Sequence, residues 1–259
     1  MPMTVFGRAK WFVRAVAALA ALVPCAARAD FHIRSPDEID EDEWEFEHNG
    51  SASFDRNPLN NGETSYTLEI GRGVTSWWHP ELELDIGRNA GPDQPTQIQG
   101  VTWENTFQLT EPGEYWLDLG LYWEYSQSTQ QETPNGTLFG VLMQKDWGPT
   151  THTLNLFLDK DIGPNQDDMH GFDFSYAWQS RWNVNRYASP AVEIYGDAGQ
   201  INRLPRFADQ QLLIGPVLLG SVPTGTSGQL KYELGWLFGA TAATPQGTLR
   251  WRLEWETHF

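Results

Sequence analysis

Apolar and polar residues alternate with a period of two along most of the chain beyond residue 43. The last segment shows the pattern best. From 249 to 259 the odd positions carry Leu, Trp, Leu, Trp, Thr and Phe, and the even positions carry Arg, Arg, Glu, Glu and His. Because successive side chains of a strand point to opposite faces of a sheet, this segment is predicted to be a strand with one apolar and one charged face.

The same alternation recurs throughout the chain. Four weaker runs, including one that Pro216 weakens because proline cannot donate a hydrogen bond to a neighbouring strand, bring the total to about twelve. The pattern predicts an all-β fold of antiparallel strands. The clear runs lie near 43–54, 66–70, 81–86, 101–109, 115–125, 172–183, 229–238 and 249–259, and the weaker ones near 136–147, 152–160, 190–197 and 210–222.

The connections between these runs differ in length. Breaks near Thr75, Pro112 and Gly148-Pro149 are expected to be tight, and the one around 245–247 is also short. Outer-membrane barrels have an even number of strands, with short turns on the periplasmic side and longer loops outside. If both termini are periplasmic, the odd-numbered connections should be long. This holds for the first five of them, which lie near 58–62, 90–95, 128–135, 163–168 and 199–208.

A soluble β-sandwich also has one apolar face per strand, so alternation alone does not separate the two classes. Many runs reach the ~10 residues that a tilted strand needs to cross a bilayer. Trp and Tyr also recur near the ends of the apolar faces, as an interfacial girdle requires. These features favour an antiparallel transmembrane β-barrel of about 12 strands over the sandwich. The girdle candidates are Trp44, Tyr66, Trp78, Tyr115, Trp123, Tyr125 and Trp182.

Residues 1–29 have the features of a cleaved secretory signal peptide. Cationic residues precede a short apolar run, and Ala27-Arg28-Ala29 forms a small-x-small cleavage pattern. The run is shorter than the ~20 residues of a spanning helix, although a weak membrane anchor is an alternative. After the leader we predict an acidic periplasmic lead-in over residues 30–42, with a lumen plug as the alternative, and a barrel over residues 43–259.

Composition narrows the function classes. Aromatic residues make up 13% of the 259 residues and there are 24 Gly, which argues against a helical bundle. The chain has 17 Lys and Arg against 34 Asp and Glu, which disfavours nucleic acid as a partner because phosphates need cations. Cys25 is the single cysteine and falls in the predicted leader, where lipid attachment is an alternative. We predict no cofactor and no metal site.

If the apolar faces meet lipid, the opposite faces line an acidic lumen. Rings of carboxylates favour cations and repel anions. The predicted function is therefore an outer-membrane channel or transporter, not an enzyme, that passes small cationic or neutral solutes. The residues in the inward phase are Glu43, Glu45, Glu47, Glu69, Glu81, Glu83, Asp85, Glu104, Asp118, Glu124, Asp173, Arg181, Lys231, Glu233, Arg250, Arg252, Glu254 and Glu256.

Two other functions stay open. A narrow barrel can be filled by its own side chains, so a structural or plugged barrel without conductance is one alternative. A lipid hydrolase is the other, because Ser180-Arg181-Trp182-Asn183 resembles part of an outer-membrane phospholipase motif, and His48-Asn49-Gly50-Ser51 invites the same comparison. The preceding His-x-Ser-Asn-Gly element is absent, Ser180 falls on the predicted lipid side, and His170 is too distant along the strand to be its base.

A loop cluster of Asp167, Asp168, His170 and Asp173 offers hard-cation ligands. No EF-hand loop or His-x-x-x-His spacing accompanies these residues. We expect a solvated acidic loop there.

The chain ends in an aromatic residue that closes an alternating strand. Trp251, Leu253, Trp255 and Phe259 share one phase and resemble the C-terminal recognition signal of bacterial outer-membrane β-barrel proteins, with Thr257 as the one departure. The resemblance implies the barrel assembly machinery and outer-membrane lipids as partners in a Gram-negative bacterium. The transported solute is not encoded in any motif.

Four further stretches, at 43–47, 192–197, 210–216 and 232–239, resemble outer-membrane proteins grouped with the phenol-degradation meta-pathway family, which are often described as transporters. The likeness consists of short motifs without a catalytic signature. It therefore implies location and fold rather than a specific activity.

Overall fold

The computed structural model describes residues 31–37, 39–166, 171–225 and 227–259, so the predicted leader over residues 1–29 lies outside the described part. Twelve strands fill most of that part, with two short 3-10 helices at Ile201–Arg203 and Phe207–Asp209. The strands are β1 (Trp44–Phe54), β2 (Thr64–Arg72), β3 (Trp78–Arg88), β4 (Gln97–Gln108), β5 (Asp118–Ser128), β6 (Asn135–Trp147), β7 (Thr150–Ile162), β8 (Asp173–Trp182), β9 (Ser189–Gln200), β10 (Gln211–Thr224), β11 (Gly228–Gly239) and β12 (Gly247–Thr257).

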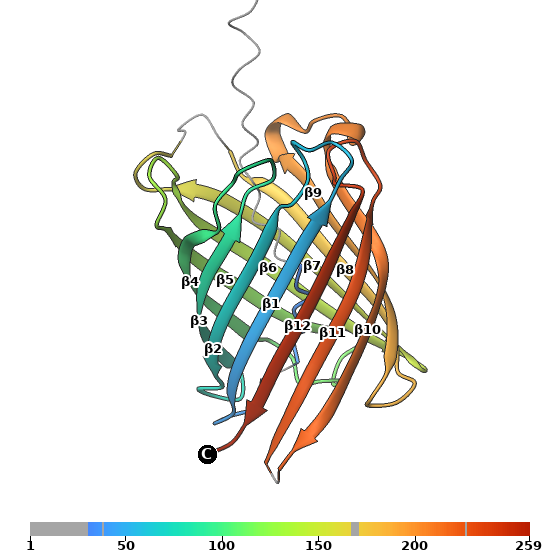
Figure 1. The fold of residues 1–259 in the computed structure, drawn as a ribbon. Coiled ribbons are helices and arrows are strands. Elements are labelled where there is room, and N and C mark those ends of the chain that lie inside the picture. Colours follow the sequence, from blue (N-terminus) through green and yellow to red (C-terminus); the bar gives the residue numbers. More distant parts are fainter. Residues whose placement is uncertain (1–30, 38, 167–170, 226) are drawn as a thin grey trace, which may run out of the picture.

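Each strand pairs with the next in the chain, and β1 pairs with β12, so the sheet closes into a barrel (Figure 1). The pairings are antiparallel, and the closing pair runs from Trp44 opposite Thr257 to Phe54 opposite Gly247. Closure removes the free edges that an open sheet exposes. The predicted antiparallel barrel of about 12 strands is confirmed, and the four weaker runs form β6, β7, β9 and β10.

The alternation along each strand separates an apolar outside from a mainly polar inside. Large apolar side chains on the outer face are exposed, among them Leu68, Leu82, Trp103 and Leu234, each between 47% and 56% exposed. Their neighbours in sequence are buried inside, as in β1, where Glu45 and Glu47 flank the exposed Phe46. No helix among the described residues is long and apolar enough to span a membrane.

The connections gather at two ends of the barrel. We call the end that holds the C-terminus the C-terminal rim; it carries the connections at 73–77, 109–117, 148–149, 183–188 and 225–227 (Figure 1). The opposite end, here the loop rim, carries those at 55–63, 89–96, 129–134, 163–172, 201–210 and 240–246. Most of the longer connections therefore share one end, as the sequence predicted.

Two connections differ from their predictions in length. The one around 245–247, expected to be short, spans residues 240–246. The break near Pro112 was expected to be tight, but it spans residues 109–117, because Pro112 lacks a ladder N–H and Gly113 adopts a φ of 73°. The Gly113 N–H donates to the Asp118 carboxylate at 2.7 Å and fixes the turn. Tyr115 and Trp116 therefore lie on an exposed connection and not at a strand end.

Residues 31–37, which we call the N-terminal segment, lie inside the barrel. His32, Ile33 and Arg34 are each 8% exposed, and they contact side chains that face inward from β4, β7 and β9. Asp40, Glu41 and Asp42 are exposed. Within the acidic periplasmic lead-in predicted over residues 30–42, residues 32–34 are thus buried inside the barrel and residues 40–42 are exposed.

Candidate functional site: the barrel lumen

Inward-facing carboxylates line up in rows across neighbouring strands. The register places Glu254, Glu47, Glu69 and Glu83 of β12, β1, β2 and β3 side by side. Like charges directly opposite one another destabilise a sheet, so such a row needs donors or cations around it. The Asn49 amide supplies one, donating to Glu69 at 2.9 Å.

Arg250 on β12 provides the most buried cation of the lumen. It is 1% exposed and pairs with Glu193 of β9 and with Glu233 of β11, whose carboxylate lies 2.6 Å from Arg250 Nη1. Glu193 also accepts from Gln179 at 2.7 Å and from the Tyr195 hydroxyl at 2.9 Å. Buried charges are stable only when paired and hydrogen-bonded in this way.

Arg252 and Lys231 hold the remaining acids of β12 and β1. Arg252 pairs with Glu47 at 2.5 Å and with Glu254 at 2.6 Å. Lys231 Nζ lies 3.0 Å from Glu254 and also pairs with Glu256. The predicted inward-phase cations of β11 and β12 therefore serve as local counter-ions to the lumen carboxylates.

The N-terminal segment supplies a further cation to the lumen. Arg34 donates two hydrogen bonds to the Glu104 carboxylate, at 3.0 and 3.1 Å, and its guanidinium lies 4.3 Å from the centre of the Tyr122 ring. Its main chain exchanges hydrogen bonds with the Asn155 amide at 2.8 and 2.7 Å. Both bonds to Glu104 come from Nη2, so the guanidinium is held by an ion pair and by a cation–π contact with Tyr122.

Other residues of the segment contact β6 and β9. The Ser35 hydroxyl donates to Gln144 at 2.9 Å, and the Gln144 amide donates to Asp37 at 2.6 Å. Phe31 packs edge-on against Tyr195 with ring centres 5.2 Å apart. Contacts on β4, β6, β7 and β9 together tie the segment across the interior of the barrel.

One part of the lumen wall is apolar, which the sequence prediction missed. Ile33 packs in a cluster of inward residues from β8 to β11, namely Ala177, Ala191, Tyr195, Leu213, Val217, Leu219 and Leu237. Outward positions between them, such as Ile214 and Leu218, are also apolar and exposed. An uninterrupted apolar run does not reveal which residues face inward, and for that reason the sequence pattern did not find this wall.

A cavity of about 390 Å³ opens toward the C-terminal rim between β8 and β12. Its lining includes the cationic side chains of Arg181, Arg186, Lys231 and Arg252. The cations that line this cavity therefore come from β8, β11, β12 and the 183–188 connection.

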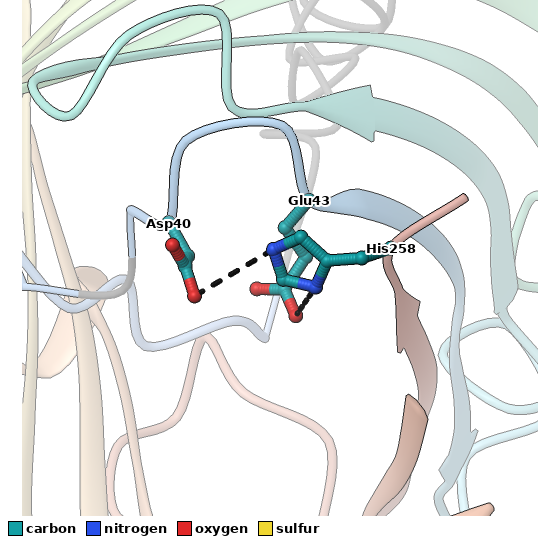
Figure 2. A group of neighbouring side chains, drawn as sticks. All are labelled: Asp40, Glu43 and His258. Atoms are coloured by element: carbon teal, nitrogen blue, oxygen red, sulfur yellow. Dashed lines mark ion pairs between the residues drawn. The ribbon is translucent and has the colours of Figure 1, made fainter. Parts of the chain in front are cut away.

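The C-terminal rim itself carries a small acidic group with a histidine (Figure 2). His258 lies 3.8 Å from Asp40 and 3.9 Å from Glu43, between the start of β1 and the end of β12. Partial burial raises the pKa of Glu43, and the neighbouring His258 opposes that rise when it is charged.

The structure buries most of the predicted lumen residues and brings them close together. Glu124, Asp173, Arg181, Lys231 and Glu233 are half-buried, and Asp118 also fixes the turn described above. The fully buried members are Glu45, Glu47, Glu69, Glu83, Asp85, Glu104, Asp118, Arg250, Arg252, Glu254 and Glu256. Of the assembly-signal residues, Trp251, Leu253 and Trp255 lie on the outer face of β12, and Phe259 follows that strand, 89% exposed.

The two pieces that suggested a hydrolase fall on different faces. The register sets Ser180 opposite His152 of β7 on the outer phase, and His152 Nε2 lies 3.0 Å from the Thr150 hydroxyl. In the other piece, Asn49 and Ser51 face inward, while His48 contacts Trp251 on the outside. Of the loop cluster that was expected to be a solvated acidic loop, Asp167, Asp168 and His170 lie outside the described residues.

Comparison with known proteins gives the fold and no family. No family model and no curated protein sequence matches the chain. Among solved structures it is similar to the KdgM porin, with a TM-score of 0.52 and 8% identity over 84% of this chain and 99% of that one. It is also similar to the NanC porin, with a TM-score of 0.54 and 11% identity over 83% of this chain and all of that one. At these identities the likeness shows a shared barrel fold, and the resemblance to the phenol-degradation meta-pathway family stays a prediction.

Proposed function

We propose that this protein is an outer-membrane channel of a Gram-negative bacterium, exported by a cleaved leader, that passes small cationic or neutral polar solutes. The observation that carries the proposal is the acidic inner face of a closed barrel whose outer face is apolar. Carboxylates on β1 to β4 form one continuous inner surface, and carboxylate surfaces concentrate cations. The shared fold with the KdgM and NanC porins supports the channel class.

The N-terminal segment sets the working aperture in this proposal. Because Arg34 is clamped to Glu104 and Asn155, and Ile33 packs on the apolar wall, the segment crosses the space through which solutes pass. In this proposal solutes pass beside the segment, along the inner face that carries the carboxylates of β1 to β3. Small solutes therefore fit the proposal better than large ones.

Single-channel recording in a planar bilayer under a salt gradient tests the proposal. We expect small discrete conductance steps and a reversal potential of cation-selective sign. Replacing Glu69 and Glu83 by Gln removes two neighbouring carboxylates of the inner row and should move the reversal potential toward zero.

Asp93→Asn serves as the matched control. Asp93 is exposed on the loop rim with a φ of 59°, a conformation that Asn tolerates, so its loss of charge leaves the lumen unchanged. Anion-selective steps would contradict the proposal and would point instead to the cation-lined cavity as the selective element. Equal shifts in the lumen and loop variants would show that the inner row does not set selectivity.

One observation favours a second candidate, a plugged barrel with no conductance. The segment and the ion pairs bury many inward side chains, with Glu193, Leu142 and Leu237 each 0% exposed. A folded, membrane-inserted protein that carries no current would support that function over the channel.

A further inference from the structure

A compact group of metal-ligand types lies on the inner face near the C-terminal rim, apart from the ion pairs that fill the middle of the lumen. It consists of Glu45 on β1 and His79 and Glu81 on β3, which each offer one ligand atom within 4.8 Å of the others. Glu45 and His79 are buried and Glu81 is nearly so, with 14% of its side chain exposed. We propose that Glu45, His79 and Glu81 bind a divalent transition-metal ion, with Zn²⁺ as the best match.

The strand register builds this site around a glycine. Glu45, Gly71 and Glu81 are direct neighbours in one row across β1, β2 and β3, and His79 shares their face two residues before Glu81. A Cβ atom at position 71 would collide with His79 Nε2 and approach the Glu81 side chain. The missing side chain at Gly71 therefore leaves a hollow that the imidazole and the carboxylate share.

His79 is the observation that separates this group from an ordinary acidic patch. The residue is 4% exposed, and its Nε2 makes no hydrogen bond to any described residue. That nitrogen lies 3.8 Å from the Glu81 carboxylate, and Nδ1 lies 3.5 Å from Glu45. Buried polar atoms of this kind are normally satisfied, so an unpartnered imidazole nitrogen facing carboxylates indicates a missing partner.

The spacing of the donor atoms suits one small ion. Two ligand atoms at about 2.0 to 2.2 Å from a tetrahedral Zn²⁺ are roughly 3.4 Å apart. The Nε2 atom of His79 lies 3.8 Å from the Glu81 carboxylate, and one ligand atom of each of the three residues lies within 4.8 Å of the others, so small side-chain shifts would bring them around one ion. Three protein ligands of mixed N and O type with an open fourth position are typical of accessible zinc sites. Imidazole also selects transition metals over Ca²⁺ and Mg²⁺, which prefer oxygen alone.

The negative charge around His79 also favours a bound cation. Among the described residues Glu45 and Glu81 form ion pairs with His79 alone, while Lys231 and Arg252 pair with Glu254, Glu256 and Glu47. Two buried carboxylates around one imidazole carry excess negative charge. A divalent cation compensates that charge and occupies the unpartnered nitrogen at the same time.

An access route leads from solvent to the site. Glu45 also belongs to a second ligand group with Glu43 and Glu256, and Glu43 belongs to a third with Asp40 and His258 (Figure 2). Asp40 and His258 are exposed, so the three groups form a chain of donors from the C-terminal rim to the buried imidazole. A cation that enters from the C-terminal rim therefore has carboxylate ligands along the route to His79.

The test is metal titration of the full-length protein, expressed with its leader and extracted from outer membranes in detergent. We expect one saturable Zn²⁺ site by calorimetry, and Co²⁺ in its place should give the visible absorption bands of a nitrogen- and oxygen-ligated ion. His79→Gln and Glu81→Gln should each weaken Zn²⁺ binding by at least ~10-fold, because even outer-shell partners contribute 10 to 100-fold.

His152→Gln is the matched control. His152 lies on the outer face of β7, so its replacement should leave Zn²⁺ binding unchanged. Heat-modifiable migration on a gel confirms that each variant is folded before its titration is interpreted. No saturable binding by the folded wild-type protein, or equal binding by all of the variants, would overturn the proposal.

Discussion

At the scale of single residues, the interior of this barrel depends on a few arginines that each serve two carboxylates. Arg250 joins Glu193 of β9 to Glu233 of β11, and Arg252 joins Glu47 of β1 to Glu254 of its own strand. Removing one partner of a buried pair leaves an uncompensated charge, which costs far more than the pair itself contributes. A single substitution at either arginine therefore removes ion pairs that connect more than one strand.

Arg250→Met tests this dependence, because it retains most of the side-chain volume and removes the charge. We expect a loss of about 3–5 kcal/mol in the free energy of unfolding. Urea titration followed by heat-modifiable gel migration measures that loss. The control is Arg72→Met, because Arg72 pairs with Asp42 where both side chains are largely exposed, and such pairs contribute about 0–1 kcal/mol. Equal losses in the two variants would contradict the assignment.

His79 illustrates which features of the proposed metal site could be predicted from the sequence. It shares the phase of Glu81, Glu83 and Asp85, so extending the alternating run by two positions would have placed it inside the barrel. Its approach to Glu45 could not be found in this way, because that contact depends on the register of β1, β2 and β3. Register arises from pairing between distant segments, which a one-dimensional pattern does not contain.

At the scale of elements, the strands were predictable and the N-terminal segment was not. Each strand has one face toward the outside and one toward the lumen, so apolar and polar residues alternate along its sequence with a period of two. Residues 31–37 have no such period, since their contacts come from several strands around them. Their acidic neighbours at 40–42 suggested a solvated stretch, and only those neighbours are exposed.

Deleting residues 31–36 tests whether this segment sets the aperture. We expect larger single-channel conductance, because the chain that crosses the lumen is gone. Arg34→Ala should show a smaller change in the same direction, since it removes the ion pair with Glu104 and leaves the apolar contacts of Ile33.

Arg56→Ala is the control for these recordings, because Arg56 lies on the exposed connection between β1 and β2. Conductance steps of unchanged size in the deletion variant would mean that solutes do not pass beside the segment. That result would contradict the proposed role of the segment but would leave the channel proposal unaffected.

At the scale of the whole molecule, the first and last strands meet along one seam. Inside, Arg252 pairs with Glu47, and outside, the rings of Phe46 and Trp255 stack with centres 5.5 Å apart. Trp44 and Phe259 contact each other at the rim, 6.4 Å apart. The apolar phase of the last strand thus serves the seam, whatever further role it has in assembly.

Removing Phe259 separates these roles. Only a ring contact with Trp44 is lost, so the purified variant should fold in detergent almost as well as the wild type. If the C-terminal residue is read by the assembly machinery, the amount that reaches the outer membrane should nevertheless fall several-fold. Membrane fractionation measures that amount. Undiminished recovery from the outer membrane would exclude Phe259 from an assembly signal.

The pairing of β1 with β12 also limits when the barrel can close during folding. Trp44 and Thr257 are direct partners although nearly the whole barrel separates them in the chain, so the barrel cannot close before its last strand has been synthesised. Contacts between such distant segments form slowly, because the chain loses conformational entropy before the favourable contacts form. Until then one edge of β1 and one edge of β12 have no partner strand. The closing contact therefore depends on both ends of the strand order being present at once.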